Sequence, residues 1–231
     1  MTAPDQVLVF SATAGYRHDS IPAGAAALAE LAAPHGLRTR HTEDPDDLRP
    51  DVLDGCAAVV FLSPTGEVLH ANARRHLKAY VTGGGGFLGV HAAACAEEGW
   101  PYYGDLLGAR FTGHPEIQPA VVTVEDHGHP ATAKLPARWT WTDEWYDFGA
   151  NPRALPGGSP GDGVRVLASV DERLYQGGTM GADHPLMWCH APGAGRSFYT
   201  ALGHLESAYL DPDFRASLEG ALLWCAALDL R

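Results

Sequence analysis

The stretch GGGGFLGVHAAA, residues 83–94, decides the fold that the rest of the chain must form. Its apolar residues lead up to a single histidine, His91, and small residues follow directly. This order is typical of a strand that ends in a tight elbow, where small neighbours let one side chain project at the carboxyl end of a parallel strand. Serine or cysteine usually occupies the elbow, whereas this chain has His91. The four glycines come before the strand, so we expect them to serve tight packing at the strand entry.

Short apolar runs on either side of the elbow predict the other strands. In the first third, strands at residues 7–10, 37–42, 57–62 and 87–90 alternate with helices that begin at Ser20 and near Leu69, which predicts a parallel α/β sheet. The middle third has strand-like segments at residues 120–124, 139–142 and 164–168 without clear helices between them, so we expect added antiparallel strands. Parallel pairing is expected again for residues 186–189 and 196–202. A last helix should begin at Pro212, with Asp211 as its cap.

The composition is that of a globular protein, with 45% hydrophobic and 19% charged residues in 231 positions. We expect residues 1–231 to form one domain, with a surface loop rather than a linker at residues 149–163. The formal charge of −12 argues against nucleic acid or an anionic membrane surface as a partner. The start of the chain shows no basic or apolar targeting pattern, and no run of about 18 apolar residues occurs, so a cytoplasmic location is expected.

The candidate site residues share a position, because each follows a predicted strand or lies in an aromatic-rich segment of the middle third. Ligands of open α/β sheets bind at the carboxyl ends of the strands, so we expect these side chains to face one cleft. Aromatic neighbours are expected to raise the pKa of the glutamate in this set. The catalytic candidates are His91, His204, Glu144, His18 and His114, and the substrate-binding candidates are Tyr16, Arg17, Glu67, Asp143 and Trp145.

These residues do not determine which cofactor, if any, the protein binds. Several imidazoles and a carboxylate would suit a divalent metal such as zinc, although the short spacings of common zinc motifs are absent from the sequence. A nucleotide cofactor is not expected, because a dinucleotide site needs its glycines after a strand. The four cysteines form no CxxC pair, which argues against a thiolate metal site and a disulfide framework. Cys95 is the alternative nucleophile, for amide hydrolysis.

Six motifs spread along the chain resemble the trehalose-utilisation (ThuA-like) family. They are GYRHDSI at 15–21, GGFLGVHAA at 85–93, DEWY at 143–146, HPLMW at 184–188, FYTALGH at 198–204 and YLDPDFR at 209–215. The resemblance implies a flavodoxin-like, class I glutamine amidotransferase-like fold and a role in trehalose, keto-sugar or glycoside metabolism. The spacing of His204 and Glu206 also resembles the His–Glu part of an amidotransferase triad. With His91 at the elbow in place of cysteine, we do not expect a glutamine amidotransferase. Cys189-His190 stands where many members have a basic residue.

Two functions therefore compete. The first is an enzyme that hydrolyses, eliminates from or isomerises a small carbohydrate-like substrate in a cleft centred on His91. The second is a sugar-binding or regulatory protein that has kept the fold without the catalysis. Both functions are compatible with a homo-oligomer.

Overall fold

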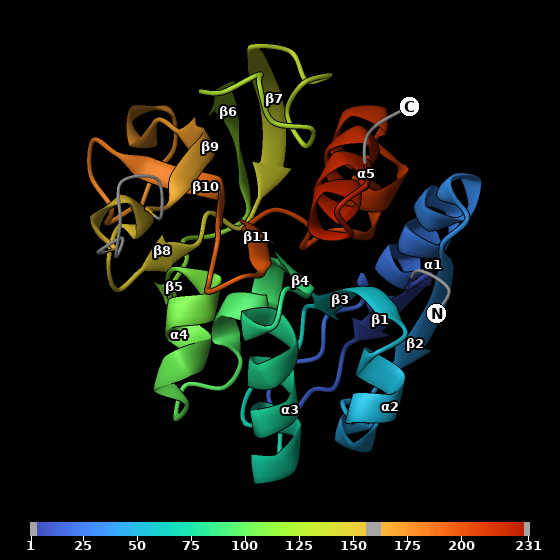
Figure 1. Cartoon of the computed structure of the whole chain (residues 1–231). Helices are drawn as coiled ribbons and strands as arrows, with labels where there is room; N and C mark the ends of the chain where they lie inside the picture. Colours follow the sequence, from blue (N-terminus) through green and yellow to red (C-terminus); the bar gives the residue numbers. More distant parts are fainter. Residues whose placement is uncertain (1–3, 156–162, 229–231) are drawn as a thin grey trace.

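The computed structural model describes residues 4–155 and 163–228. Part of the loop predicted at residues 149–163 therefore lies outside the described residues. The main sheet has nine strands in the order β2-β1-β3-β4-β11-β10-β9-β6-β7 (Figure 1). Its strands are β1 (Gln6–Phe10), β2 (Arg38–Thr42), β3 (Cys56–Leu62), β4 (Gly86–Val90), β6 (Gln118–Val124), β7 (Arg138–Asp143), β9 (Arg165–Val170), β10 (His184–His190) and β11 (Arg196–Thr200).

Five strands, β2-β1-β3-β4-β11, pair in parallel, and the other four pair antiparallel. The parallel half has the order of a flavodoxin-like sheet, as predicted. The antiparallel strands of the middle third are also confirmed. The prediction for β10 was wrong, because it pairs antiparallel with β11. The physical reason is the short connection at residues 191–195, which can close a hairpin but cannot carry a parallel crossover.

Helices cover both faces of the parallel half (Figure 1). α1 (Ile21–Ala32) packs against α5 (Pro212–Cys225) on one face, while α3 (Ala71–Thr82) and α4 (Pro101–Leu107) cover the other. The short α2 (Pro50–Leu53) packs beside α3. A separate two-stranded sheet pairs β5 (Phe111–Gly113) with β8 (Asp147–Phe148). Within the described part of the chain, no helix is long and apolar enough to span a membrane.

The glycine run that precedes β4 serves the packing role expected of it. Gly84 has φ +117°, a backbone conformation that residues with a side chain rarely adopt. A Cβ on Gly85 would lie 2.4 Å from the ring of Tyr80, and one on Gly86 would lie 2.0 Å from the carbonyl oxygen of Cys225. The absence of side chains therefore lets β4 enter the sheet directly beneath the end of α5.

The two predicted helix caps have different outcomes. Asp211 accepts hydrogen bonds from the backbone N–H groups of Asp213 and Phe214, both at 2.9 Å, and caps α5 as predicted. Ser20 stands at the cap position of α1, but its side chain makes no capping bond. Its hydroxyl donates instead to the carbonyl of Gly203 at 3.2 Å. Ser20 therefore ties the start of α1 to the segment that follows β11.

Candidate active site

The elbow after β4 places His91 at the centre of the site. His91 has φ +49°, which is unusual for a residue other than glycine, and its side chain is fully buried. A 3₁₀ helix, His91–Cys95, follows at once, so the predicted strand–elbow–helix turn is confirmed with a tighter helix than expected. Backbone strain of this kind is often found where one side chain must be held in a functional position.

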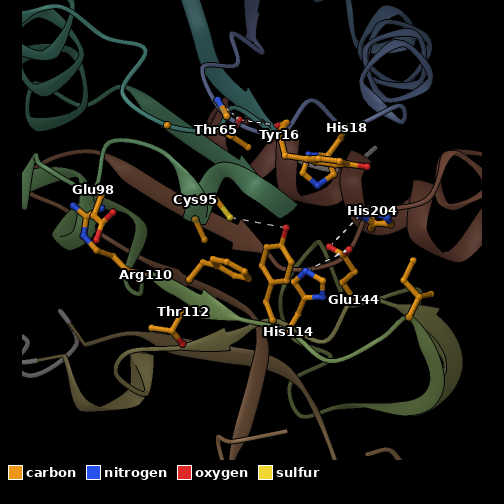
Figure 2. Close-up of a pocket in the computed structure, with 16 residues that line it drawn as sticks. Tyr16, His18, Thr65, Cys95, Glu98, Arg110, Thr112, His114, Glu144 and His204 are labelled. Carbon is orange, nitrogen blue, oxygen red and sulfur yellow. Dashed lines mark hydrogen bonds and ion pairs between the residues drawn. The ribbon is translucent and has the colours of Figure 1, made fainter. Parts of the chain in front are cut away.

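Four strand ends bring four side chains into one cluster. His18 follows β1, His91 follows β4, Glu144 follows β7 and His204 follows β11. Each offers one ligand atom, and these atoms all lie within 4.8 Å of one another. Nδ1 of His204 lies 3.1 Å from Oε2 of Glu144 (Figure 2). Nε2 of His91 lies 3.4 Å from the same oxygen. We call these four residues the His–Glu cluster.

The hydrogen bonds of His91 determine which nitrogen faces the cluster. Nδ1 lies 2.7 Å from the carbonyl oxygen of Ala201, which can only accept, so Nδ1 carries the hydrogen. In the neutral ring, Nε2 then has its lone pair directed toward Glu144 and His204. The hydroxyl of Tyr146 donates to this nitrogen at 2.9 Å. His91 is therefore oriented as a metal-binding or proton-accepting imidazole commonly is, with a carbonyl holding its far side.

His18 is a buried imidazole with an unused nitrogen. Only 4% of its surface is exposed, and its ring meets that of His91 edge-on with 4.8 Å between centroids. Burial, together with the positive charge that His91 and His204 would carry, lowers the pKa of His18 to about 3. Among the residues that the structure describes, its Nδ1 has no hydrogen-bond partner. A neutral ring with an orphaned nitrogen is well suited to binding a cation at its free edge.

Glu144 is ionised, contrary to the expectation from its aromatic neighbours. Burial acts to raise the pKa of Glu144, but its interactions with His204 and His91 outweigh burial, and the net shift is downward. For His204, burial lowers the pKa, while the carboxylate of Glu144 outweighs burial and raises it above the ordinary value. The aromatic neighbours were therefore a poor guide, because the imidazoles dominate the surroundings of this carboxylate.

His114 lies on the open side of the cluster, just past β5. Its Nδ1 donates to the carbonyl of Pro115 at 2.8 Å, so in the neutral ring Nε2 is free to accept a proton. This nitrogen lies 3.6 Å from Oε1 of Glu144, and about a third of the side chain is exposed. The structure thus brings all five predicted catalytic residues into one region.

A cavity of about 1080 Å³ opens in front of the cluster. It lies beside the loops after β1 and β3, where the strand order of the sheet reverses and where such folds usually bind ligands. Arg110 and Glu98 lie on the side of the pocket away from Glu144 and His204 (Figure 2). The pocket is lined by Gly15, Tyr16, His18, Thr65, Gly66, Ala94, Cys95, Glu98, Arg110, Phe111, Thr112, His114, Ile117, Glu144, Tyr146 and His204.

The predicted substrate-binding residues separate into three groups. Tyr16 lines the pocket with most of its surface exposed. Arg17 and Glu67 are not among the lining residues: Arg17 pairs with Glu43 at 2.6 Å, and Glu67 pairs with Arg74. Asp143 and Trp145 are fully buried beneath the pocket.

Eleven of the sixteen lining residues were not among the predicted site residues, and these include Tyr146, Glu98 and Arg110. Tyr146 shares the pocket side of its segment with Glu144, as the alternation of an extended strand requires, so this alternation was the usable signal. Glu98 comes from the irregular segment after the elbow and Arg110 from the loop between α4 and β5, and no sequence periodicity describes either segment. The guanidinium of Arg110 donates to the carbonyls of Ala96, Glu97 and Trp100, which hold it at the pocket wall.

The amidotransferase-like features have other partners here. Burial raises the pKa of the Cys95 thiol to about 12, so at neutral pH it is protonated and a poor nucleophile. His204 takes Glu144 as its carboxylate partner, whereas Glu206 lies exposed at the start of the 3₁₀ helix Glu206–Leu210. The geometry therefore does not support amide hydrolysis by Cys95.

A second group of titratable residues fixes the backbone of Tyr146. Nε2 of His184 donates to the carbonyl of Tyr146 at 2.9 Å. Nδ1 of His184 lies 2.9 Å from Oε1 of Glu172 and 2.8 Å from the hydroxyl of Tyr175. Glu172 also accepts hydrogen bonds from two backbone N–H groups. This network is occupied by its own hydrogen bonds and fixes the backbone from which Tyr146 reaches His91.

The sheet order defines a mixed α/β protein with a flavodoxin-like parallel half and added antiparallel strands, and histidine occupies the elbow after β4. The chain belongs to the ThuA family, described as trehalose utilisation, whose sequence profile matches residues 6–225. No curated protein matches the sequence.

Solved structures share the fold at low sequence identity. A ThuA-like protein from Bacteroides uniformis is 23% identical over 97% of this chain and 93% of its own, with a TM-score of 0.79. One from Parabacteroides merdae is 18% identical over 99% and 92% of the two chains, with a TM-score of 0.78. A β-galactosidase from Bacillus circulans sp. alkalophilus is 12% identical over 98% of this chain but only 32% of its own, with a TM-score of 0.64.

Proposed function

We propose that the protein is an enzyme of carbohydrate metabolism that binds a divalent metal in the His–Glu cluster and moves protons on a small sugar derivative. The observation that carries this proposal is the convergence of His18, His91, Glu144 and His204, with ligand atoms within 4.8 Å of one another. Three imidazoles and one carboxylate form a donor set that zinc and related metals accept, and a bound metal would displace the proton that Glu144 favours on His204. The family description, trehalose utilisation, supports a carbohydrate-like substrate.

The donor atoms fit a cation in charge and orientation. The carbonyl of Ala201 directs Nε2 of His91 into the cluster, and burial keeps His18 neutral. Glu144 is ionised and provides one negative charge. A metal bound there would polarise a carbonyl or hydroxyl oxygen of the substrate. The ligand residues would then serve to orient that oxygen at the inner end of the cavity.

Proton transfer falls to His114 on the open side. Its Nε2 can accept a proton because Nδ1 is engaged with Pro115, and it stands 3.6 Å from Glu144. A base beside a polarised carbonyl suits isomerisation or elimination, in which a proton next to the carbonyl is removed. Hydrolysis, which the sequence also allowed, would instead need His114 to activate a water molecule.

Metal analysis and hydrogen exchange test this proposal together. Protein purified without a histidine tag should contain about one divalent metal per chain, and H91A and H204A should lose it while remaining folded. Keto-sugars incubated with the protein in D₂O should exchange the hydrogen next to the carbonyl, and H114A should slow this exchange by about 100-fold or more.

Two results would count against the proposal. If the purified protein contains no stoichiometric metal and a chelator does not affect turnover, the proposed role of a metal is excluded. Sugar binding without exchange or turnover would favour the sugar-binding or regulatory alternative. The free cysteines of the described residues lead us to propose a cytoplasmic location. Fractionation of the native cells would test that location.

A further inference from the structure

Asp143 is a buried carboxylate that connects two segments of the His–Glu cluster. Its side chain has no exposed surface. Oδ1 accepts hydrogen bonds from the backbone N–H of Glu144 at 2.9 Å and of His204 at 3.2 Å. Oδ2 accepts from Nε1 of Trp141 and the backbone N–H of Gly203, both at 2.9 Å. Four donors therefore replace the water that a charged carboxylate loses on burial.

The sheet itself cannot set the distance between Glu144 and His204. Glu144 follows β7 and His204 follows β11, and three strands, β10, β9 and β6, lie between these two in the sheet. No ladder hydrogen bond therefore joins β7 to β11. Asp143 accepts hydrogen bonds from backbone N–H groups of both segments and so links their main chains.

The segment after β11 is built to receive this carboxylate. Gly203 has φ +117°, and a Cβ there would lie 2.8 Å from the hydroxyl oxygen of Tyr209. The carbonyl of Gly203 accepts from Ser20 at 3.2 Å and from Tyr209 at 3.1 Å, while its N–H donates to Asp143. The peptide is thus held from both sides, and the next residue, His204, turns toward Glu144.

Charge gives Asp143 a second effect. Within the cluster, only Glu144 is an acid, and its single negative charge would leave a divalent cation half compensated. Asp143 adds a negative charge directly behind Glu144 and His204, in an interior where charge interactions are weakly screened. The two carboxylates together match the charge of a divalent metal.

We infer that Asp143 is a positioning residue that holds Glu144 and His204 in contact and so preorganises the His–Glu cluster for a divalent cation. This inference rests on the proposed function, because the contact concerns two of the proposed metal ligands. It replaces the expectation that Asp143 touches the substrate. Residues that orient metal ligands commonly change metal affinity by 10- to 100-fold when they are substituted.

The isosteric variant D143N provides the test. Its amide nitrogen must face two of the four N–H donors, so either the pair from Glu144 and His204 or the pair from Trp141 and Gly203 is lost. We expect D143N to bind Co²⁺ at least about tenfold more weakly than the wild-type protein. In metal-free crystals of D143N, Nδ1 of His204 and Oε2 of Glu144 should lie beyond hydrogen-bond distance, compared with 3.1 Å here.

E97Q is the matched control. Glu97 is another fully buried carboxylate that accepts two backbone N–H bonds, from Val68 and Leu69, and it lies outside the cluster. E97Q should lower the melting temperature but leave the Co²⁺ affinity within about twofold of the wild-type value. If Asp143 had a purely structural role, D143N would likewise lower the melting temperature and leave the Co²⁺ affinity unchanged.

The outcomes separate this inference from the proposed function. If the wild-type protein binds no Co²⁺, the metal proposal fails, and the metal-free structure of D143N alone decides the role of Asp143. If D143N keeps both the Glu144–His204 contact and the affinity for Co²⁺, the inference is wrong. If D143N does not fold, W141F provides a second test, because it removes only one of the four hydrogen-bond donors to Asp143. W141F should hold Asp143 less firmly and weaken Co²⁺ binding about threefold. An unchanged Co²⁺ affinity in W141F would overturn the inference.

Discussion

The hydroxyl of Tyr146 donates to Nε2 of His91 across 2.9 Å, and Nε2 is the nitrogen that faces Glu144 and His204. A lone pair can serve only one strong partner at a time. Tyr146 and a bound cation would therefore compete for His91. If a cation bound Nε2, the Tyr146 hydroxyl would be free to donate to another acceptor in the pocket, such as a substrate oxygen.

Substitution of Tyr146 by phenylalanine tests this competition. Because one hydrogen bond contributes about 1 kcal/mol, Y146F should bind Co²⁺ about fivefold more tightly than the wild-type protein. Calorimetric titration of tag-free, metal-free protein would measure the change. Y199F is the matched control, because the hydroxyl of Tyr199 donates to the carbonyl of the same His91 at 2.8 Å. Y199F should lose stability without gaining affinity, and a tenfold loss of affinity in Y146F would make Tyr146 a ligand instead.

The cysteines give a prediction about the rejected amidase chemistry. Burial raises the thiol pKa of Cys56 to about 11 and those of Cys95 and Cys189 to about 12, and it raises that of Cys225 as well. The reactive thiolate is therefore at least about 100-fold rarer in the native protein than in a free thiol. At pH 8, iodoacetamide should label the native chain slowly and all four cysteines quickly in denaturant. Fast, selective labelling of Cys95, detected by mass spectrometry, would revive it as a nucleophile.

His129 gives a pH dependence that is independent of the active site. Burial lowers its pKa to about 4 from the ordinary 6.5, and its ring packs between Phe198 and Trp224. Below pH 6.5 the unfolded chain takes up a proton at this position that the folded chain refuses, so stability falls as the pH drops toward 4. Over this window the loss is about 3 kcal/mol.

The variant H129N removes this titration. Urea unfolding at pH 8 and at pH 5 should show a smaller acid loss in H129N than in the wild-type protein, by about 2 kcal/mol. At pH 8 both side chains are neutral, so the difference in unfolding free energy between H129N and the wild-type protein at that pH measures the packing lost in the variant. Equal acid losses in the two proteins would show that His129 is not held neutral by the fold.

Residues that end strands were well predicted from the sequence, because a strand end is a local feature with a known place in a parallel sheet. His18, His91 and His204 converge for this reason. The roles of Asp143 and Glu144 could have been separated by strand alternation, which places Glu144 on the pocket side and Asp143 beneath it. The antiparallel pairing of β10 and the position of Arg110 depend on hairpin closure and loop packing, which no periodicity describes.

The glycine run before the elbow leads to the last prediction, because Gly84 and Gly86 are needed for different reasons. At Gly84 a side chain would have open space but must adopt φ +117°, which costs about 1–2 kcal/mol. At Gly86 a Cβ would meet the carbonyl oxygen of Cys225 at 2.0 Å, a backbone atom that cannot move without displacing α5. G86A should therefore lose about 3 kcal/mol or more and G84A clearly less, as measured by urea unfolding. Because β4 carries His91, G86A should also weaken Co²⁺ binding, while G84A should retain it. Equal losses from the two variants would show that the close approach of β4 to α5 does not determine the position of the elbow.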